Sequence, residues 1–286
     1  MNMNNQNFGY TLKRIRESRG LSQTYLAADI VSRTSISKIE NGKQEPTISN
    51  AKKLITRLDL NTNEFFYIQN DYKLDSKMQI LYDFMNLSET TQDEPISKLI
   101  NECKNYLSNT FDVKINSILI VLESLQNFEK GYDLSTLYEN LKPVWERLSK
   151  LDDWLIIDLF LINNILYFFP IDTASNMAIH ALKTIKSKYP HLLKLKNAFY
   201  LNLSFLFLQK NLKDQATEYL FKSIEICKIT HRYDLLLLAK IRLSICTKNL
   251  KKIEEFCELL TAIEATNLVQ GVKREVKYFL NVDLSI

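Results

Sequence analysis

The sequence is poor in glycine and proline, with five of each in 286 residues. Turn-dense all-β folds use both residues heavily, and glycine-rich loops are the usual cradle for phosphate groups. The shortage therefore argues against a turn-rich all-β fold and against a glycine-rich nucleotide site. The sequence also lacks any run of about 18 apolar residues, and segment 1–8 has neither the basic nor the apolar stretch of a secretion signal. We therefore expect a soluble cytoplasmic protein.

Signatures of catalysis and of metal binding are missing as well. Nucleophile elbows, phosphate loops and paired-carboxylate motifs do not occur, and Asp152-Asp153 is interpreted as the N-cap of a helix. We therefore predict neither an enzyme nor a bound cofactor or metal. The three histidines, His180, His191 and His231, show no metal-ligand spacing among themselves or with the cysteines. The cysteines form no C-x-x-C pair, which indicates reduced, buried thiols: Cys103, Cys227, Cys246 and Cys257.

Positive charge is concentrated in the first quarter of the chain. Residues 1–70 contain ten Lys or Arg and six Asp or Glu, whereas the remaining residues are balanced, so the whole formal net charge of +4 lies in this segment. A small basic unit attached to a neutral body is typical of a phosphate-binding module with a separate sensor. A solvated basic face explains the charge alone equally well.

Residues 9–66 contain five short segments with apolar residues at helical spacing. The first, 9–18, ends before Gly20, and the third ends at Asn41-Gly42, where glycine suits a helix C-terminus. The sequence therefore predicts a compact five-helix unit. Residues suited to N-cap positions precede the later segments: Ser22, Ser32, Thr47 or Ser49, and Asn61 to Asn63.

The motif LSQxxLA at residues 21–27, followed by SISKIENGK at 35–43 and by Pro46, resembles the helix-turn-helix of the phage-repressor (XRE) class. In such a motif the third helix enters the major groove by its N-terminal end. Arg33 and Lys38 can reach guanine, and the methyl group of Thr34 can contact thymine. Gln23 lies at a helix start that can bind phosphate, and residues 41–43 can offer backbone N–H groups and an ammonium. The candidate DNA-binding residues are Arg14, Gln23, Arg33, Thr34, Ser37, Lys38, Asn41 and Lys43.

The turn between the second and third helices departs from the usual pattern. It lacks the glycine common in this class and is one residue shorter over 26–32. The short turn resembles that of the Rgg/GadR/MutR regulators, which join such a head to a body of helical repeats.

From residue 71 to 286 the pattern consists of helix pairs with a period of about 40 residues, which indicates an α-solenoid. Helices are predicted to start near residues 75, 95, 113, 135, 152, 173, 192, 213, 231, 250 and 269, and Pro143 marks a kink or a later start. One copy matches the tetratricopeptide pattern, and an offset of 38 residues relates it to its neighbours. We predict about five degenerate repeats with a C-terminal capping helix. The positions matched are Tyr200, Leu203, Ser204, Phe207, Ala216, Leu220 and Ser223.

The concave wall of a helix-pair solenoid suits an extended peptide. Asn164 and Asn202 occupy equivalent positions, and an amide can both donate to and accept from a peptide backbone. Hydrogen bonding within or between the protein's own helices is the alternative role for both. Three basic side chains are candidates for a peptide carboxylate, although a solvated role is as consistent with the sequence: Arg147, Lys150 and Arg242. Lys240 lies 38 residues after Asn202 and is a further candidate peptide-binding residue.

Head and body together resemble the peptide-pheromone-responsive Rgg family along the chain. The resemblance implies residues 1–70 as a DNA-binding domain and residues 71–286 as a domain for peptide binding and dimerisation. It implies a cytoplasmic homodimeric transcription regulator of quorum sensing that binds an operator in double-stranded DNA and a short hydrophobic peptide. An XRE regulator without a peptide ligand, or a peptide- or protein-binding scaffold, are the alternatives. The apolar last helix, with Val272, Val276, Phe279 and Leu280, is either a dimer interface or a cap of the solenoid.

Overall fold

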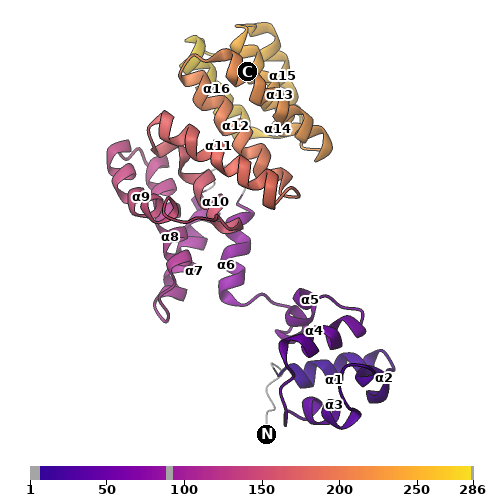
Figure 1. The fold of residues 1–286 in the computed structure, drawn as a ribbon. Helices are drawn as coiled ribbons and strands as arrows, with labels where there is room; N and C mark the ends of the chain where they lie inside the picture. The colour runs from indigo at the N-terminus through magenta and orange to yellow at the C-terminus, as the bar shows by residue number, and fades with distance from the viewer. Residues whose placement is uncertain (1–6, 88–92, 285–286) are drawn as a thin grey trace. The chain divides into compact units, whose positions relative to one another are not determined.

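The computed structural model describes residues 7–87 and 93–284, and all regular structure in these ranges is helical (Figure 1). This confirms the predicted all-α fold class. The chain divides into two compact units, Met1–Gln79 and Ile80–Ile286. The division falls within α6 (Ser76–Met85), and the end of the predicted head, residue 70, directly follows the last residue of α5. No helix in the described ranges is both long enough and apolar enough to cross a membrane.

The first unit contains five short helices, each of which starts at a side-chain cap. The predicted caps Ser22, Ser32, Thr47 and Asn61 are confirmed, because each accepts a hydrogen bond from the backbone N–H three residues later. These bonds satisfy N–H groups that have no partner inside a helix. The helices are α1 (Phe8–Ser18), α2 (Gln23–Ala27), α3 (Arg33–Glu40), α4 (Ile48–Arg57) and α5 (Thr62–Gln69).

The core of this unit forms where α1 and α3 approach closely. Leu12, Ile36 and Phe65 are fully buried in it. A Cβ atom on Gly9 would lie 1.8 Å from the carbonyl oxygen of Ile39, so only glycine fits at that position of α1.

The turn between α2 and α3 explains the missing glycine noted in the sequence. Asp29 has φ = 56°, in the left-handed region where glycine is favoured. Aspartate is among the few other residues that tolerate this conformation. The left-handed turn position is therefore kept, and an aspartate occupies it.

The second unit is a succession of antiparallel helix pairs arranged in two layers (Figure 1). Helices α8, α10, α12, α14 and α16 contact one another in order, and α9, α11, α13 and α15 lie between them in the chain. The bounds are α7 (Asp93–Leu107), α8 (Val113–Glu129), α9 (Leu134–Leu148), α10 (Ile156–Ile165), a 3₁₀ turn η1 (Leu166–Phe168), α11 (Ile171–Lys188), α12 (Leu193–Gln209), α13 (Lys213–Ile229), α14 (Tyr233–Cys246), α15 (Leu250–Ala262) and α16 (Thr266–Leu280).

The tetratricopeptide-like copy forms α12 and α13, as predicted. Ser204, Ala216 and Ser223 are completely buried where these two helices pack together, beside Leu203 and Leu220. Small side chains at these positions allow the two helix axes to approach closely.

Tight turns join the last helices without glycine. Asn211, His231, Lys248 and Glu264 each have φ between 54° and 59° and each directly precedes the capping residue of the next helix. A left-handed residue ends a helix and reverses the chain within a few residues. This shared turn explains how a sequence with five glycines forms so many helix hairpins.

One expectation for the body is wrong in detail. Asp152-Asp153 does not cap a helix, because α10 starts at Ile156, and the Asp158 carboxylate accepts from the backbone N–H of Leu155 instead. Of the two alternatives for Pro143, the later helix start is excluded, because this proline lies inside α9. A carboxylate in the first turn of a helix stabilises its start, just as a carboxylate at the N-cap does. Acidic residues near position 152 therefore do not by themselves locate the first residue of α10.

The last helix packs into the body. Val272 and Val276 of α16 are completely buried, and Phe279 and Leu280 pack against the same core. These contacts make α16 a cap of the body.

All four cysteines are free thiols, and three of them are buried. Burial raises the pKa of Cys103 to about 12 and that of Cys257 to about 11. Both thiols are therefore protonated at neutral pH, the form that is inert to oxidation and alkylation.

Candidate functional site

Helix α3 presents polar side chains to solvent, and its opposite side packs into the core of the head. Arg33, Thr34 and Lys38 are exposed, whereas Ile36 and Ile39 are buried. Because residues three or four apart share a helix face, the buried isoleucines direct the other side chains outward. The structure thus brings the three predicted base-reading residues together on one exposed surface.

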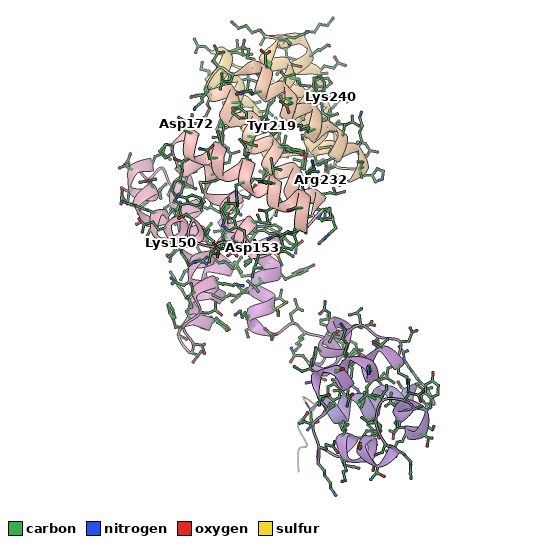
Figure 2. All side chains as sticks on the ribbon, viewed as in Figure 1. Lys150, Asp153, Asp172, Tyr219, Arg232 and Lys240 are labelled. Carbon is green, nitrogen blue, oxygen red and sulfur yellow. The ribbon has the colours of Figure 1, made fainter. Side chains whose placement is uncertain are left out.

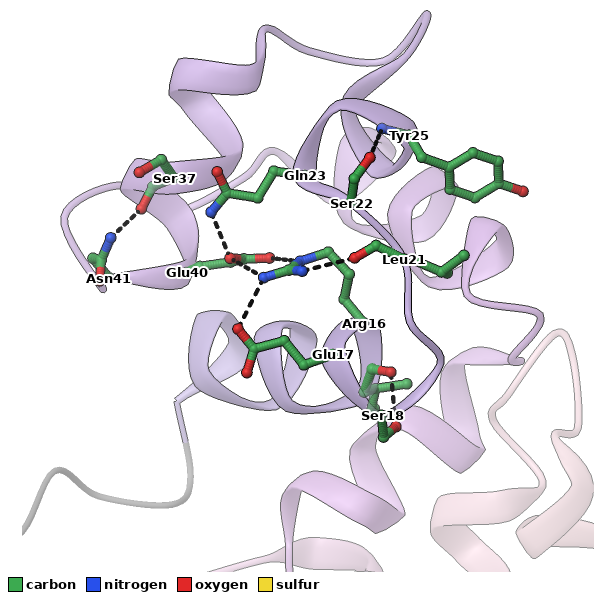
Figure 3. Close-up of polar contacts among 11 residues, drawn as sticks. Arg16, Glu17, Ser18, Leu21, Ser22, Gln23, Tyr25, Ser37, Glu40 and Asn41 are labelled. Carbon is green, nitrogen blue, oxygen red and sulfur yellow. Dashed lines mark hydrogen bonds and ion pairs between the residues drawn. The ribbon is translucent and has the colours of Figure 1, made fainter.

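A buried ion pair holds α3 against α1 (Figure 3). The Arg16 Nε donates to Glu40 at 2.6 Å and its Nη2 donates to the second carboxylate oxygen at 3.0 Å. Arg16 also donates to the carbonyl oxygen of Leu21 at 2.8 Å, and the Gln23 amide donates to Glu40 at 2.9 Å. The hydrogen bond to Glu40 raises the pKa of Arg16. One network therefore connects the first three helices.

The sequence did not predict this network, although the spacing of Arg16, four residues after Leu12, places its aliphatic part on the inward side of α1. Its carboxylate partner lies 24 residues later on another helix, so no local pattern points to the pair. Because Glu40 neutralises Arg16, this arginine adds no free positive charge to the surface.

Two predicted phosphate contacts are corrected by the hydrogen bonding. The backbone N–H groups of Asn41, Gly42 and Lys43 all donate to carbonyl oxygens of α3, so they are not available to a phosphate. The Asn41 side chain also donates to the carbonyl oxygen of Ser37, at 2.7 Å. Of this segment, the second N–H of the exposed Asn41 amide and the exposed ammonium of Lys43 remain for the predicted role.

Arg14 and Gln23 are already engaged inside the head. An Arg14 Nη2 donates to the carbonyl oxygen of Ile68, at the end of α5, at 3.1 Å. The Gln23 side chain belongs to the network of Arg16 and Glu40. The structure thus gives both side chains contacts that stabilise the head.

The body has one face on which three helices present equivalent residues, and we call it the repeat face. Its nine residues lie on or directly after α10, on α12 and on α14, and the offset of 38 residues relates them. All nine are partly or fully exposed. They form a polar row, Asn164, Asn202 and Lys240, between two mainly apolar rows, Phe160, Ala198 and Leu236, and Tyr167, Phe205 and Leu243.

The two asparagines of the polar row have partners in the structure. The Asn164 Nδ2 donates to the carbonyl oxygen of Phe160 within its own helix, at 2.9 Å. Asn202 accepts from the Tyr167 hydroxyl at 2.6 Å and donates to the Asn163 side chain at 3.0 Å. The alternative role considered from the sequence, bonding within and between helices, is therefore present at both positions. Asn164 keeps its Oδ1 and its second N–H, which is enough to hold one peptide group.

The four basic candidates do not form one cluster. Arg242 is buried, pairs with Glu275 at 2.5 and 2.9 Å and donates to the carbonyl oxygen of Leu201 at 2.7 Å. Its charge is used inside the body, so it is not a candidate for a peptide carboxylate. Lys150 is exposed near the turn after α9, in a different part of the body from Lys240 (Figure 2).

Arg147 faces a buried carboxylate near the start of α10. Its Nη2 lies 3.8 Å from the Asp158 Oδ1, and neither atom has a hydrogen-bond partner. The two groups thus form a long ion pair without a hydrogen bond. This site lies outside the repeat face. Among the described residues, no cluster of three or more His, Cys, Asp or Glu side chains is placed to hold a metal ion.

Comparison with known proteins identifies the head first. A helix-turn-helix family model matches residues 12–65, so the exposed turn of α3 belongs to a helix-turn-helix domain. Among proteins of curated function, no relative matches the chain.

Solved structures match along the whole chain. A transcriptional regulator from Listeria monocytogenes EGD-e is 19% identical with a TM-score of 0.71, and the match covers 96% of this chain and 97% of that one. Bacillus thuringiensis PlcR, solved with the peptide PapR7 and DNA, is 16% identical with a TM-score of 0.69 and coverages of 93% and 99%. The Streptococcus dysgalactiae SHP pheromone receptor Rgg2 is 14% identical with a TM-score of 0.65 and coverages of 95% and 99%. The chain therefore has the fold of these regulators, which confirms the predicted head and helical-repeat body.

The buried ion pair generates a stability prediction. Replacing Glu40 with alanine leaves the Arg16 charge buried without its carboxylate, which should destabilise the head by about 3–5 kcal/mol. Urea unfolding of the full chain, with hydrogen exchange followed in segment 8–69, measures the loss. The exposed Glu45→Ala should change stability by less than about 0.5 kcal/mol. A loss at Glu40 below about 1 kcal/mol would contradict a structural role for the pair.

Proposed function

We propose that this chain is a cytoplasmic transcription regulator of the Rgg type, which binds operator DNA through its head and a short signalling peptide through its repeat body. One observation carries the proposal: a helix-turn-helix domain and a helix-pair body occur together in the fold shared with PlcR and Rgg2. PlcR was solved in complex with the peptide PapR7 and DNA, and Rgg2 is a receptor of the SHP pheromone. The free thiols agree with a reducing compartment. We propose no catalytic activity.

The DNA site is proposed on the exposed side of α3, from Arg33 and Thr34 in its first turn to Lys38 in its last. Arg33 and Lys38 can donate to guanine O6 and N7 in the major groove, and Thr34 can contact a thymine methyl group. Ser37, half-buried on the same helix, is a secondary candidate. Lys43 supplies a phosphate contact, which adds affinity without sequence preference.

Arginine 33 and lysine 43 should respond differently to substitution. Arg33→Ala should cost about 1–3 kcal/mol on the preferred duplex and relax base preference, because a base contact is lost. Lys43→Ala should weaken all duplexes similarly and reduce the slope of log affinity against log salt by about one unit, because one phosphate contact is lost. Fluorescence anisotropy on duplexes selected from a random library, at several salt concentrations, measures both effects. Lys228→Ala, in the second unit, is the control. Equal affinity of Arg33→Ala and wild type for the selected duplex would exclude Arg33 as a base reader.

The peptide site is proposed on the repeat face. A polar row between two apolar rows fits an extended peptide, whose backbone groups meet amides while its side chains alternate to either side. Asn164 has hydrogen-bonding capacity left for this role, and Asn202 keeps a second lone pair on the oxygen that accepts from Tyr167. Peptide binding must also change DNA affinity for signalling, and DNA must then change peptide affinity by the same factor.

Asn164→Ala tests the peptide site directly. Loss of this amide leaves a peptide group without its partner, at a cost of about 1–3 kcal/mol, or roughly 5- to 150-fold in affinity. Fluorescein-labelled apolar peptides, synthesised from the short reading frames beside the gene, provide the titration. Asn267→Ala, an exposed asparagine of α16, is the matched control. Unchanged affinity in Asn164→Ala, with an unchanged circular dichroism spectrum, would remove this residue from the site.

A homodimer is proposed because one head covers a single segment of the major groove, whereas two related heads read two half-sites. The valines of α16 are buried, so we propose a different contact surface in the body. Phe221 of α13 and Leu259 of α15 are 38 residues apart, and 58% and 47% of their surfaces are exposed. Large apolar side chains at equivalent positions of neighbouring repeats form a surface that a second copy can cover.

A charged residue on that surface should separate the copies. The double variant Phe221→Glu, Leu259→Glu should sediment as a monomer at a concentration where wild type is a dimer, because association would bury two uncompensated carboxylates of each copy. Analytical ultracentrifugation of the full chain measures the mass. Ile48→Glu, at a residue of the head that is 90% exposed, is the control. A variant that remains dimeric would place the interface elsewhere.

A further inference from the structure

The polar row of the repeat face changes chemistry at its last position. Asn164 on α10 and Asn202 on α12 are followed on α14 by Lys240, with the same spacing and similar partial exposure. An amide both donates and accepts, whereas an ammonium only donates and carries a full charge. The third position therefore suits an anionic group better than a neutral peptide group.

The charge of Lys240 is not neutralised inside the body. Its Nζ lies 5.3 Å from the centre of the Phe256 ring, and no carboxylate of the described residues forms an ion pair with it. Arg242, two residues later on the same helix, is neutralised by Glu275. Lys240 thus leaves a positive charge at one end of an otherwise uncharged face.

The surroundings of this charge are mainly apolar. Leu236 and Leu243 flank Lys240 on α14, and the Phe256 ring lies 5.3 Å from its Nζ. A charge pair formed beside apolar side chains and shielded from water is stronger than one in open solvent.

We propose that Lys240 binds a carboxylate of the peptide and so determines which part of the peptide lies at α14; a C-terminal carboxylate would also fix the direction of the peptide on the repeat face. This inference rests on the proposed peptide function. Neighbouring helices are about 8–10 Å apart and an extended chain advances about 3.3 Å per residue, so each helix spans about three peptide residues. A C-terminal carboxylate at α14 places the peptide group held by Asn202 about three residues before it and the group held by Asn164 about six residues before it, whereas an internal carboxylate fixes the same separations in either direction.

The carboxylate has two possible sources, the peptide C-terminus and an acidic side chain. Three sets of fluorescein-labelled eight-residue peptides separate them, all built from Leu, Ile, Val, Phe and Gly. The first set has a free C-terminal carboxylate, the second a C-terminal amide, and the third a C-terminal amide with one internal Asp or Glu. Each set is titrated against wild type, Lys240→Gln, Lys240→Arg and the control Lys228→Gln, whose lysine lies on α13.

At least one carboxylate-bearing set should bind wild type about tenfold more tightly than the set without a carboxylate. Lys240→Gln should abolish that preference, Lys240→Arg should restore most of it, and Lys228→Gln should keep it. The set that loses affinity in Lys240→Gln identifies the source. Equal binding of all three sets to wild type, or a preference that survives Lys240→Gln, would overturn the inference while leaving the peptide function intact. Absence of binding by every set would overturn the peptide function as well.

Discussion

Each helix of this protein buries one stripe of its surface against its neighbours, and most other features depend on this constraint. In the body most of the buried positions of α10, α12 and α14 are related by the offset of 38 residues, as Leu161, Phe199 and Leu237 are. Several exposed positions are then also equivalent, which aligns Asn164, Asn202 and Lys240 in one row. The repeat face is thus a consequence of packing, because the buried side chains behind it hold the helices together.

The short helices of the head also bury one side each, and a buried ion pair adds to this packing. Five short helices bury few large side chains, and α1 approaches α3 so closely that only Gly9 fits between them. The pair of Arg16 and Glu40 and the amide of Gln23 connect the first three helices across this contact. A buried, fully bonded pair is a specific orienting device, because either partner alone would be an uncompensated charge. Arg33, Thr34 and Lys38 therefore project from a helix whose position is fixed.

The two units suggest how recognition of a peptide and of DNA can be divided within one chain. The free positive charges of the head suit phosphate and guanine, whereas the repeat face offers amides, apolar side chains and a single ammonium. In the structure Asn202 bonds to Asn163 and Tyr167, so a peptide bound at the proposed site would compete for groups that join α12 to α10 and η1. Peptide binding at that point would change the packing between consecutive helices, which is a route by which a signal can spread along a repeat body.

The sequence by itself determined the all-helical class, the helix-turn-helix motif, the caps at Ser22, Ser32, Thr47 and Asn61 and the helix-pair period, because these follow from local propensity and spacing. Tertiary structure alone decided which polar groups are free. Arg242 and Arg16 look like surface cations in the sequence, but both are buried against carboxylates 33 and 24 residues away. The N–H groups of residues 41–43 are used by the end of α3, and the valines of α16 belong to the core. Ion pairs between residues so far apart in the chain cannot be predicted from sequence spacing, because such a pair requires only that the two residues be close in the folded state.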